Sequence, residues 1–166
     1  RFLFFNRNRM SADYTQTKKE KLPQFGNTEA ISYNHPELSG LAPVFVAQIS
    51  NGGIYPKAGV QYYGGTKSLT FFTWIVHETL SFGRTDWFVL IRYEPAVDDE
   101  WKLYSQCELF TVLPGSSAGI YTFIQRLRVG LKQKSFAFGV GADFSNSGKG
   151  SYTSKENTGI FLRYEF

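Results

Sequence analysis

The stretch GIYTFIQRLRVGLK at residues 119–132 decides the fold class of this chain. Successive side chains of a β-strand point to opposite faces, so a strict period of two predicts a strand with two different faces. Here one face is apolar and the other is charged. Tyr121, Phe123, Leu127, Val129 and Leu131 oppose Arg126, Arg128 and Lys132.

The same alternation recurs along the chain, and turn formers such as Asn51-Gly52-Gly53 and Pro114-Gly115 separate the alternating segments. No repeat, low-complexity tract or interdomain linker interrupts residues 1–166, so a single domain is expected. The chain is predicted to be all-β. Its strands are expected near 2–10, 28–35, 41–51, 54–65, 68–80, 85–96, 101–114, 119–132, 135–146 and 157–166.

The composition narrows the classes of function. The 166 residues include 16 Phe, 10 Tyr, 3 Trp and 16 Gly, which favours strands, turns and crowded barrel interiors. The net charge of +4 is spread along the chain, apart from Lys18, Lys19 and Lys21, and does not indicate a nucleic-acid surface. The lone Cys107 excludes an internal disulfide and a structural thiolate zinc cluster.

The position of the aromatic residues separates a membrane barrel from a soluble sandwich, whose strands would alternate as well. If each strand reverses direction, aromatic residues gather at both ends of the apolar face, with a mainly aliphatic band between them. Two aromatic belts around such a band are typical of membrane interfaces. One predicted belt contains Trp87, Tyr121 and Phe144, and the other contains Tyr93, Trp101, Phe136, Tyr164 and Phe166.

The expected connections fit a bacterial barrel whose C-terminus is periplasmic. The long polar connections at 11–26 and 146–157 would lie on the outer side, and the short turns at 64–67, 97–99 and 133–134 on the periplasmic side. We therefore predict an antiparallel up-and-down transmembrane β-barrel of about ten strands, with eight to twelve left open. An even strand count would place both termini in the periplasm of a Gram-negative cell.

The charged faces of the strands would line the lumen of this barrel. Both signs are present, and pairing is expected because an unpaired buried charge is strongly destabilising. A narrow lumen filled with ion pairs would be plugged, although the same charges are also compatible with a selective pore. The predicted lumen charges are Arg92, Glu94, Glu108, Arg126, Arg128, Asp143, Arg163 and Glu165.

Residues 159–166, GIFLRYEF, resemble the C-terminal assembly signal of bacterial outer-membrane barrel proteins. The matching positions are Ile160, Leu162, Tyr164 and Phe166, whereas Phe161 stands where the family often has glycine. The resemblance implies insertion by the outer-membrane assembly machinery. The aromatic-rich strands also resemble those of barrels from Bacteroidota.

The resemblance also raises the question of lipid chemistry, because some small barrels are lipid-modifying enzymes with His and Ser two residues apart on a strand. The histidines here are His35 and His77, and the positions two residues later hold Glu37 and Thr79. Threonine is a poorer nucleophile at this spacing. We expect no catalytic residue and place His77 on the lumen face near the outer rim, while a hydrolase of lipid A or phospholipid stays open as an alternative.

Other polar groups carry weaker indications. The acids at 98–100 suggest a calcium site, but a solvated turn explains them as well, so no metal and no cofactor are expected. Cys107 is expected to face lipid, and Ser105 and Gln125 on the same face could mark a protein contact. The basic cluster at Lys18 would lie in an outer loop, either solvated or in contact with lipopolysaccharide phosphates.

The leading hypothesis is a non-enzymatic outer-membrane protein with a charge-plugged lumen. It would act as a structural component or as an accessory subunit of an envelope complex, with a lateral partner in the membrane. A narrow, porin-like diffusion channel for small solutes is the first alternative. A lipid-modifying enzyme and a soluble β-barrel with an apolar ligand are the others.

Overall fold

Ten antiparallel strands follow one another in sequence order within one sheet of the computed structural model, which describes residues 2–11, 24–80, 83–116 and 119–165. Their bounds are β1 Phe2–Ser11, β2 Gln24–Tyr33, β3 Leu41–Ser50, β4 Gly53–Gly65, β5 Leu69–Glu78, β6 Thr85–Tyr93, β7 Trp101–Leu113, β8 Tyr121–Gln133, β9 Phe136–Lys149 and β10 Ser151–Tyr164. A 3-10 helix, η1 (Pro36–Leu38), joins β2 to β3. The predicted all-β, up-and-down arrangement of ten strands is confirmed.

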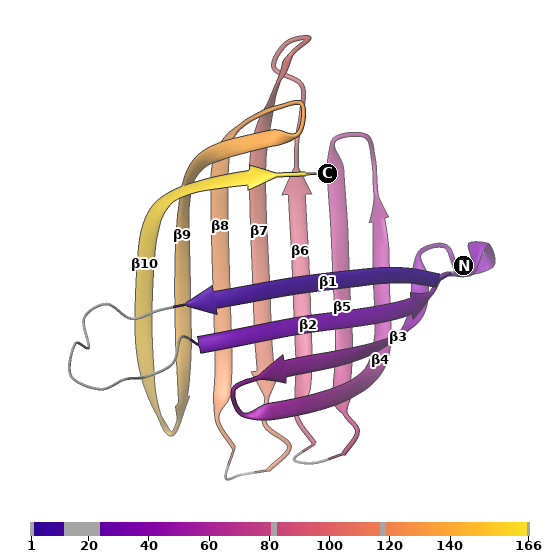
Figure 1. The fold of residues 1–166 in the computed structure, drawn as a ribbon, viewed down its shortest axis with the longest axis vertical. Helices are drawn as coiled ribbons and strands as arrows, with labels where there is room; N and C mark the ends of the chain where they lie inside the picture. Colours follow the sequence, from indigo (N-terminus) through magenta and orange to yellow (C-terminus); the bar gives the residue numbers. More distant parts are fainter. Residues whose placement is uncertain (1, 12–23, 81–82, 117–118, 166) are drawn as a thin grey trace.

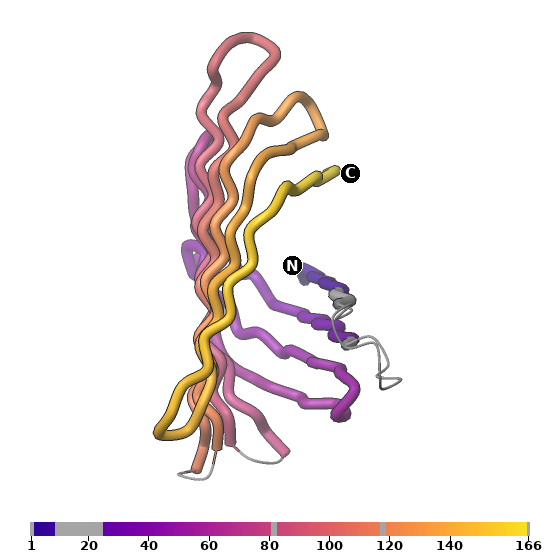
Figure 2. Tube along the Cα trace, turned by 90° about the vertical axis from the view of Figure 1, so that its left-hand side faces the viewer, coloured from indigo at the N-terminus to yellow at the C-terminus, as the bar shows by residue number. Residues whose placement is uncertain are grey.

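The sheet curls until its first strands lie across its middle ones. Figure 1 shows β1, β2 and β3 crossing in front of β6 and β7 at a steep angle. In the perpendicular view of Figure 2, both ends of the sheet project toward the same side, and both chain termini lie there. The sheet therefore has a concave face, toward which it curls, and a convex face. No helix in the described part of the chain is long and apolar enough to cross a bilayer.

The strand register drifts steadily across the sheet. Followed from pair to pair through all ten strands, Leu3 of β1 aligns with Thr153 of β10. Both residues lie near the start of their strands, although β1 and β10 run in opposite directions. If β1 and β10 paired without any drift in register, the start of β1 would lie beside the end of β10. The observed alignment is displaced from that by most of a strand length, and a closed barrel needs a stagger of this kind. Within the described ranges, β1 and β10 are the two edge strands and no ladder joins them.

The hairpin of β9 and β10 corrects the sequence-based boundaries. A long connection at 146–157 was expected, but β9 runs to Lys149, β10 begins at Ser151, and Gly150 alone separates them at φ 76°. The prediction of a loop there is wrong because this end of the hairpin is polar on both faces. Its ladder pairs continue while the period-two hydrophobic signal is absent. Likewise β2 begins at Gln24, four residues before the expected 28.

The revised connections remove the expected sorting of long and short loops. Strands are joined at one end of the sheet, which is the lower end of Figure 1 for β5 to β10, through 51–52, 79–84, 114–120 and Gly150. They are joined at the other end through 66–68, 94–100 and 134–135 at the top of Figure 1, and through 34–40 at the right of the view. These two sets are similar in length. The connection at 12–23, with Lys18, Lys19 and Lys21, lies outside the described residues. Loop length therefore does not identify the outer end of the sheet in the part that the structure describes.

The concave face has two chemically different halves. Over β2 to β6 it carries a buried apolar cluster, against which Phe72, Leu90 and Phe110 pack. Over β7 to β10 it carries most of the charged side chains. The apolar cluster consists of Ala30, Val44, Val46, Trp74, Val76 and Phe88.

Candidate functional site

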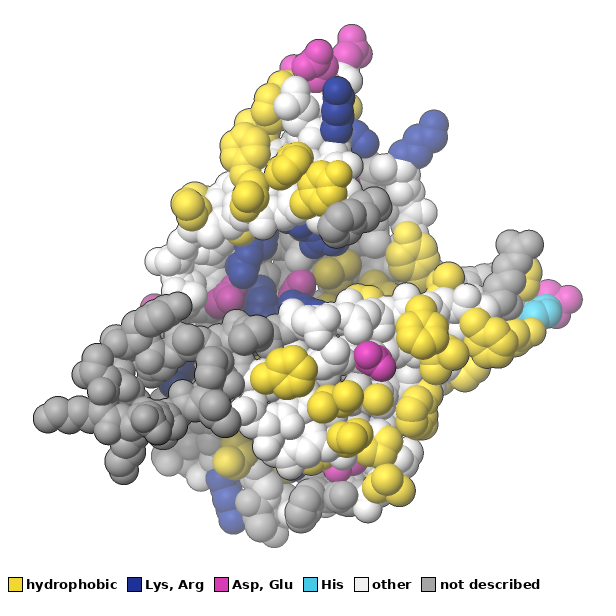
Figure 3. Space-filling view, in the orientation of Figure 1, with side chains coloured by type: hydrophobic (Ala, Val, Ile, Leu, Met, Phe, Trp, Pro, Cys, Tyr) yellow, Lys and Arg dark blue, Asp and Glu magenta, His cyan; other side chains and the backbone are white. Residues whose placement is uncertain are grey.

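The charged side chains of the last strands meet in the interior of the curled sheet. Figure 3 shows Lys, Arg, Asp and Glu side chains gathered in a central recess, while many hydrophobic side chains lie on the outward surface of the front strands among polar ones. All eight predicted lumen charges take part in ion pairs there. They are Arg92, Glu94, Glu108, Arg126, Arg128, Asp143, Arg163 and Glu165.

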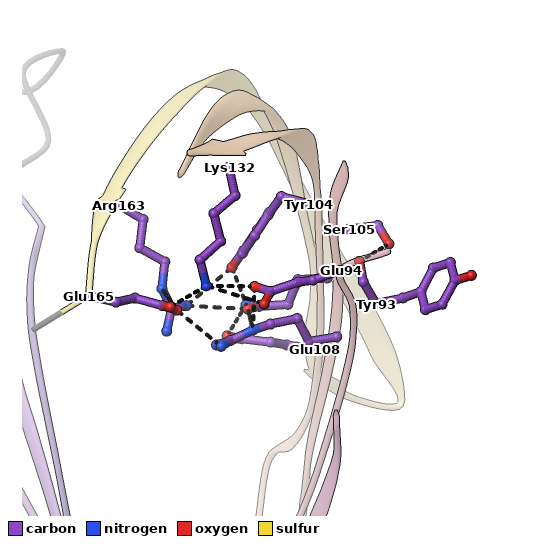
Figure 4. Close-up of polar contacts among 10 residues, drawn as sticks. Tyr93, Glu94, Tyr104, Ser105, Glu108, Lys132, Arg163 and Glu165 are labelled. Atoms are coloured by element: carbon purple, nitrogen blue, oxygen red, sulfur yellow. Dashed lines mark hydrogen bonds and ion pairs between the residues drawn. The ribbon is translucent and has the colours of Figure 1, made fainter. Parts of the chain in front are cut away.

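Lys132 and Glu165 form the centre of the upper part of this network (Figure 4). The Lys132 ammonium contacts both carboxylate oxygens of Glu94 at 3.2 Å and also pairs with Glu165. Arg92 Nη1 and Arg163 Nε reach the same Glu165 oxygen, Oε1, at 3.1 and 3.0 Å. Two carboxylates are thus shared among three cations, which closes the upper end of the interior with charge-assisted contacts.

Gln106 connects this upper group to the rest of the network. Its Oε1 accepts hydrogen bonds from the Tyr104 hydroxyl at 2.6 Å and from Arg92 Nε at 3.1 Å. Arg163 Nη1 donates to the same oxygen at 3.3 Å. The Gln106 amide nitrogen donates to Glu108 Oε1 at 2.8 Å. One buried side-chain amide therefore satisfies groups from three strands.

Glu108 is the centre of the lower part. Its Oε2 accepts from Arg126 Nη1 on the neighbouring strand and from Arg7 Nη2 on β1, both at 3.0 Å. Arg128 Nη1 lies 2.6 Å from Asp143 Oδ1, and Arg126 Nε lies 3.9 Å from Asp143 Oδ2. Because β1 and β7 are far apart in the sheet order, the contact of Arg7 with Glu108 shows that side chains span the interior.

Cations outnumber carboxylates in this connected network, so any passage through it would favour anions. The cations are Arg7, Arg92, Arg126, Arg128, Lys132 and Arg163, and the carboxylates are Glu94, Glu108, Asp143 and Glu165.

Several interior residues were not predicted from the sequence. Arg7 belongs to the network through its contact with Glu108, which is 101 residues away in the sequence, and no local sequence pattern predicts such a contact. Lys57 and Asp86 form a second, deeply buried pair on β4 and β6, and Lys57 also donates to Gln48 at 2.9 Å. Asp86 alternates correctly with Phe88, Leu90 and Arg92, so strand parity could have found it.

The convex face carries large apolar side chains at high exposure. Ile160 is 92% exposed and Val140 is 64% exposed, whereas Glu108 on the concave face is 7% exposed. The predicted belt residues of the described chain all have the convex parity of their strands, and Phe136 and Tyr164 pack with ring centroids 4.9 Å apart. Phe166 lies outside the described residues. The convex-face positions with the highest exposures are Phe2, Phe4, Ile54, Val140, Ile160 and Leu162.

A polar patch interrupts the convex face on β1 and β2. Asn6 donates to Glu29 at 3.3 Å, and Asn27 donates to Asn8 at 2.6 Å. Asn8 in turn donates to Asn6 at 2.8 Å, so the four side chains form one exposed chain of hydrogen bonds. They lie in the half of this hairpin nearer the 12–23 connection.

His77 has a different position from the one predicted. It was expected on the lumen face, but its neighbours Val76 and Glu78 occupy the concave side and His77 is exposed on the convex side. In β5 the even-numbered side chains lie on the concave face, so the odd-numbered His77 lies on the convex face, opposite to the prediction. His77 Nδ1 lies 3.0 Å from Thr85 Oγ1, while Thr79 Oγ1 donates to the Pro56 carbonyl at 3.2 Å. The two side chains of the possible catalytic pair are thus engaged with different partners.

The remaining candidates have structural surroundings. Asp98 Oδ1 accepts from the backbone N–H groups of Glu100 and Trp101 at 2.8 and 2.7 Å, which is a turn cap. No metal-binding group of three or more His, Cys, Asp or Glu side chains occurs among the described residues. Cys107 is half-buried with convex parity, and Ser105 on the same face donates to the Tyr93 carbonyl at 3.0 Å.

The fold and the interior define a class of structure: an up-and-down sheet of ten strands with a paired, charged concave face and an apolar convex face. No family model matches the chain, and neither a curated protein nor a solved structure is significantly similar to it. The function is therefore inferred from the arrangement of its own residues.

Proposed function

We propose that this chain is an integral β-barrel of the bacterial outer membrane, non-enzymatic, with a charge-plugged lumen. The observation that carries the proposal is the inverted distribution of polarity between the two faces. Apolar side chains such as Ile160 and Leu162 point outward at 92% and 73% exposure, while Glu108 and Lys57 are 7% and 4% exposed inside. Such an arrangement suits hydrocarbon outside and ion pairs inside.

The alternatives fit this distribution less well. A soluble barrel with an apolar ligand would turn its apolar face inward, and the convex exposures would be a large aggregation-prone surface in water. A diffusion channel needs a continuous passage. The interior contacts oppose one, because Arg7 reaches Glu108 and the Phe5 ring lies 6.0 Å from the Trp74 ring across the sheet. We therefore favour a plug over a pore.

The proposed partners follow from the convex face. Its apolar band would contact outer-membrane lipids, including lipopolysaccharide. Insertion by the outer-membrane assembly machinery follows from the resemblance of residues 159–166, of which Ile160, Leu162 and Tyr164 are exposed on the convex side. An accessory role in an envelope complex is supported by convex polar groups, namely Gln125 and the patch that includes Glu29.

The test of the membrane barrel is gel mobility of detergent-extracted protein, with and without boiling. A closed membrane barrel resists the detergent until heated, because every strand is paired. We expect a heat-dependent shift in mobility. Identical mobility before and after boiling, together with a monomeric state without detergent, would overturn the proposal in favour of a soluble barrel.

The accessory role has a separate test. Gln125→Leu should weaken co-purification of a lateral partner from native membranes and leave the heat-dependent shift unchanged. Unchanged co-purification in a double variant with Glu29→Leu would remove the partner hypothesis while leaving the barrel intact.

A further inference from the structure

A partly open cavity of about 240 Å³ lies on the concave side of the curled sheet, lined by residues of β1 to β3 and of β5 to β8. For comparison, an apolar cavity of about 150 Å³ is enough to bind benzene. Its walls are mainly aromatic and aliphatic. Phe5 and Trp74 meet edge to face at 6.0 Å, and the Trp74 and Phe88 rings are 5.4 Å apart. The apolar lining is Phe5, Val46, Trp74, Val76, Phe88, Phe110 and Ile124.

Gly26 creates part of this space. It lines the cavity on β2, and an added Cβ there would meet no heavy atom within 4 Å. A side chain at this position would therefore enter the cavity and not the neighbouring backbone. Gly159 on β10 has equally open surroundings but lines a different part of the concave face. The chain thus contains a matched pair of open glycines, one inside the cavity and one outside it.

Two arginines form one side of the cavity. Arg7 and Arg126 both line it, and both donate to the same oxygen of Glu108, which is not itself a lining residue. A guanidinium has five N–H donors, so one bond to Glu108 leaves donors on each arginine for another acceptor. Arg128, on the same strand and face as Arg126, does not line this cavity.

A second, polar cavity of about 220 Å³ adjoins the first and shares Gln48, Asp86 and Phe110 with it. Its other lining residues come from the strand ends at the lower end of the sheet in Figure 1, and include Lys57, Glu78 and Arg84. The interior is therefore layered, with a polar mouth, an aromatic chamber, and an ionic layer that includes Arg7, Glu108 and Arg126.

We propose that the aromatic chamber binds a compact amphiphilic anion, with a one- or two-ring or short aliphatic body and a single carboxylate, sulfonate or phosphate. The body packs against Trp74 and Phe88, and the anionic group accepts hydrogen bonds from Arg7 and Arg126. The ligand enters through the polar mouth and cannot continue, because the ionic network fills the interior beyond it. This binding site does not depend on the membrane placement, since it is formed by the concave face alone.

The test is calorimetric titration of the detergent-solubilised full chain with three probes. They are 2-naphthoate, its neutral analogue 2-naphthamide and the cation 2-naphthylmethylamine, and titrations into micelles without protein are subtracted. We expect saturable 1:1 binding of the naphthoate. Gly26→Phe should weaken it at least about tenfold by filling the chamber, whereas Gly159→Phe should leave it unchanged. Arg7→Gln should weaken binding of the naphthoate about tenfold and binding of the amide little. Arg128→Gln is the control and should leave both unchanged.

Circular dichroism and the thermal midpoint verify that each variant is folded. Should Gly26→Phe fail to fold, Arg7→Gln against Arg128→Gln decides the matter. Uptake that never saturates, equal affinity for all three probes, or equal losses in the cavity variants and their controls would overturn the proposal. The gel-mobility test of the membrane barrel can fail while this titration succeeds, and the reverse, so the two proposals are judged separately.

Discussion

The rings of Tyr104 on β7 and Phe161 on β10 lie 5.4 Å apart, although two strands separate them. The register explains this contact, because Tyr104 pairs with Gly130, Gly130 with Gly139, and Gly139 with Phe161. Two adjacent glycines thus lie between the two aromatic residues. With no side chains at these positions, the sheet bends sharply and the two rings close over the backbone.

The glycine pair is predicted to be required for this bend. A Cβ at Gly130 would lie 2.0 Å from the Phe138 carbonyl oxygen, and one at Gly139 would lie 2.2 Å from the Val129 carbonyl oxygen. Backbone atoms cannot rotate away as a side chain can. Gly130→Ala or Gly139→Ala should therefore destabilise the protein by about 1–3 kcal/mol, measured as the free energy of unfolding in urea.

Gly159→Ala is the matched control for this prediction. It lies on β10 with no heavy atom within 4 Å of an added Cβ, so its stability should change by less than about 0.5 kcal/mol. Equal stability of the Gly139→Ala and Gly159→Ala variants would show that the close backbone approach is not maintained.

Gln106 should be more important for stability than its polarity suggests. Gln106→Leu removes the acceptor of Tyr104, Arg92 and Arg163 and the donor to Glu108 in a buried position. Buried groups that lose their partners typically cost about 1–3 kcal/mol, so a loss in that range is expected in urea unfolding. Gln125→Leu, the same change on the convex face, should cost little. A smaller loss for Gln106→Leu than for Gln125→Leu would refute the role assigned to the amide.

A charge on the convex face distinguishes lipid from water. Val140 is 64% exposed there and pairs with Val129 and Ile160, both apolar. In a bilayer, Val140→Arg should destabilise the folded protein by about 2–4 kcal/mol if the position lies near the midplane. In water the same change at an exposed site should cost almost nothing. Folding into lipid vesicles measures the difference, and a cost near zero in vesicles would argue against a lipid-facing Val140.

The strands could be predicted from the sequence wherever one face is apolar. β7 and β8 differ from their expected ranges by at most two residues at either end, because their alternation is unbroken. The hairpin that turns at Gly150 was missed for the opposite reason, since its last residues are polar on both faces. Ladder hydrogen bonds, a side-chain hydrogen bond from Ser154 to Asn146 and an edge-to-face contact of Tyr152 with Tyr121 hold it together, and none of these produces an alternating hydrophobic pattern.

The interior could be predicted only in part. Parity within each strand placed charges such as Arg126 and Glu108 together, since neighbouring strands share a face. The contact of Arg7 with Glu108 depends on how far the sheet curls, which a local pattern does not determine. The apolar interior of β2 to β6 was missed because both faces of those strands are rich in apolar residues, as Val44 and Phe45 illustrate, so alternation loses its contrast.

The stagger of the sheet predicts how β1 and β10 would close in a membrane. Leu3 aligns with Thr153 when the pairing is followed through the ten strands. For β1 and β10 to pair directly, the partner of Leu3 must lie nearer the end of β10, and the shift must be an even number of residues so that concave side chains stay opposite concave ones. A shift of about ten residues places Leu3 opposite Arg163 and Phe4 opposite Leu162. Unpaired backbone groups in hydrocarbon make such closure strongly favourable. A disulfide between Phe4→Cys and Leu162→Cys should therefore form within one chain.

This cross-link is measured in a Cys107→Ala background by mass and non-reducing gel mobility. Moving the second cysteine to Ile160 or Tyr164 tests neighbouring registers on the same face. A cross-link only between chains would show that the edges of β1 and β10 pair with other molecules, which contradicts closure of a single barrel.

Glu165 is predicted to hold the plug closed. Its carboxylate is shared by Arg92, Lys132 and Arg163, so Glu165→Ala leaves these three cations with Glu94 as the one carboxylate of the upper group. Their repulsion should open a passage lined by positive charge. In planar bilayers the unaltered protein should show no stable unitary steps, and the variant should show anion-selective ones. Glu156→Ala, an exposed acid on the same strand, should behave like the unaltered protein. Identical conductance steps in all three would show that the interior network does not block ions.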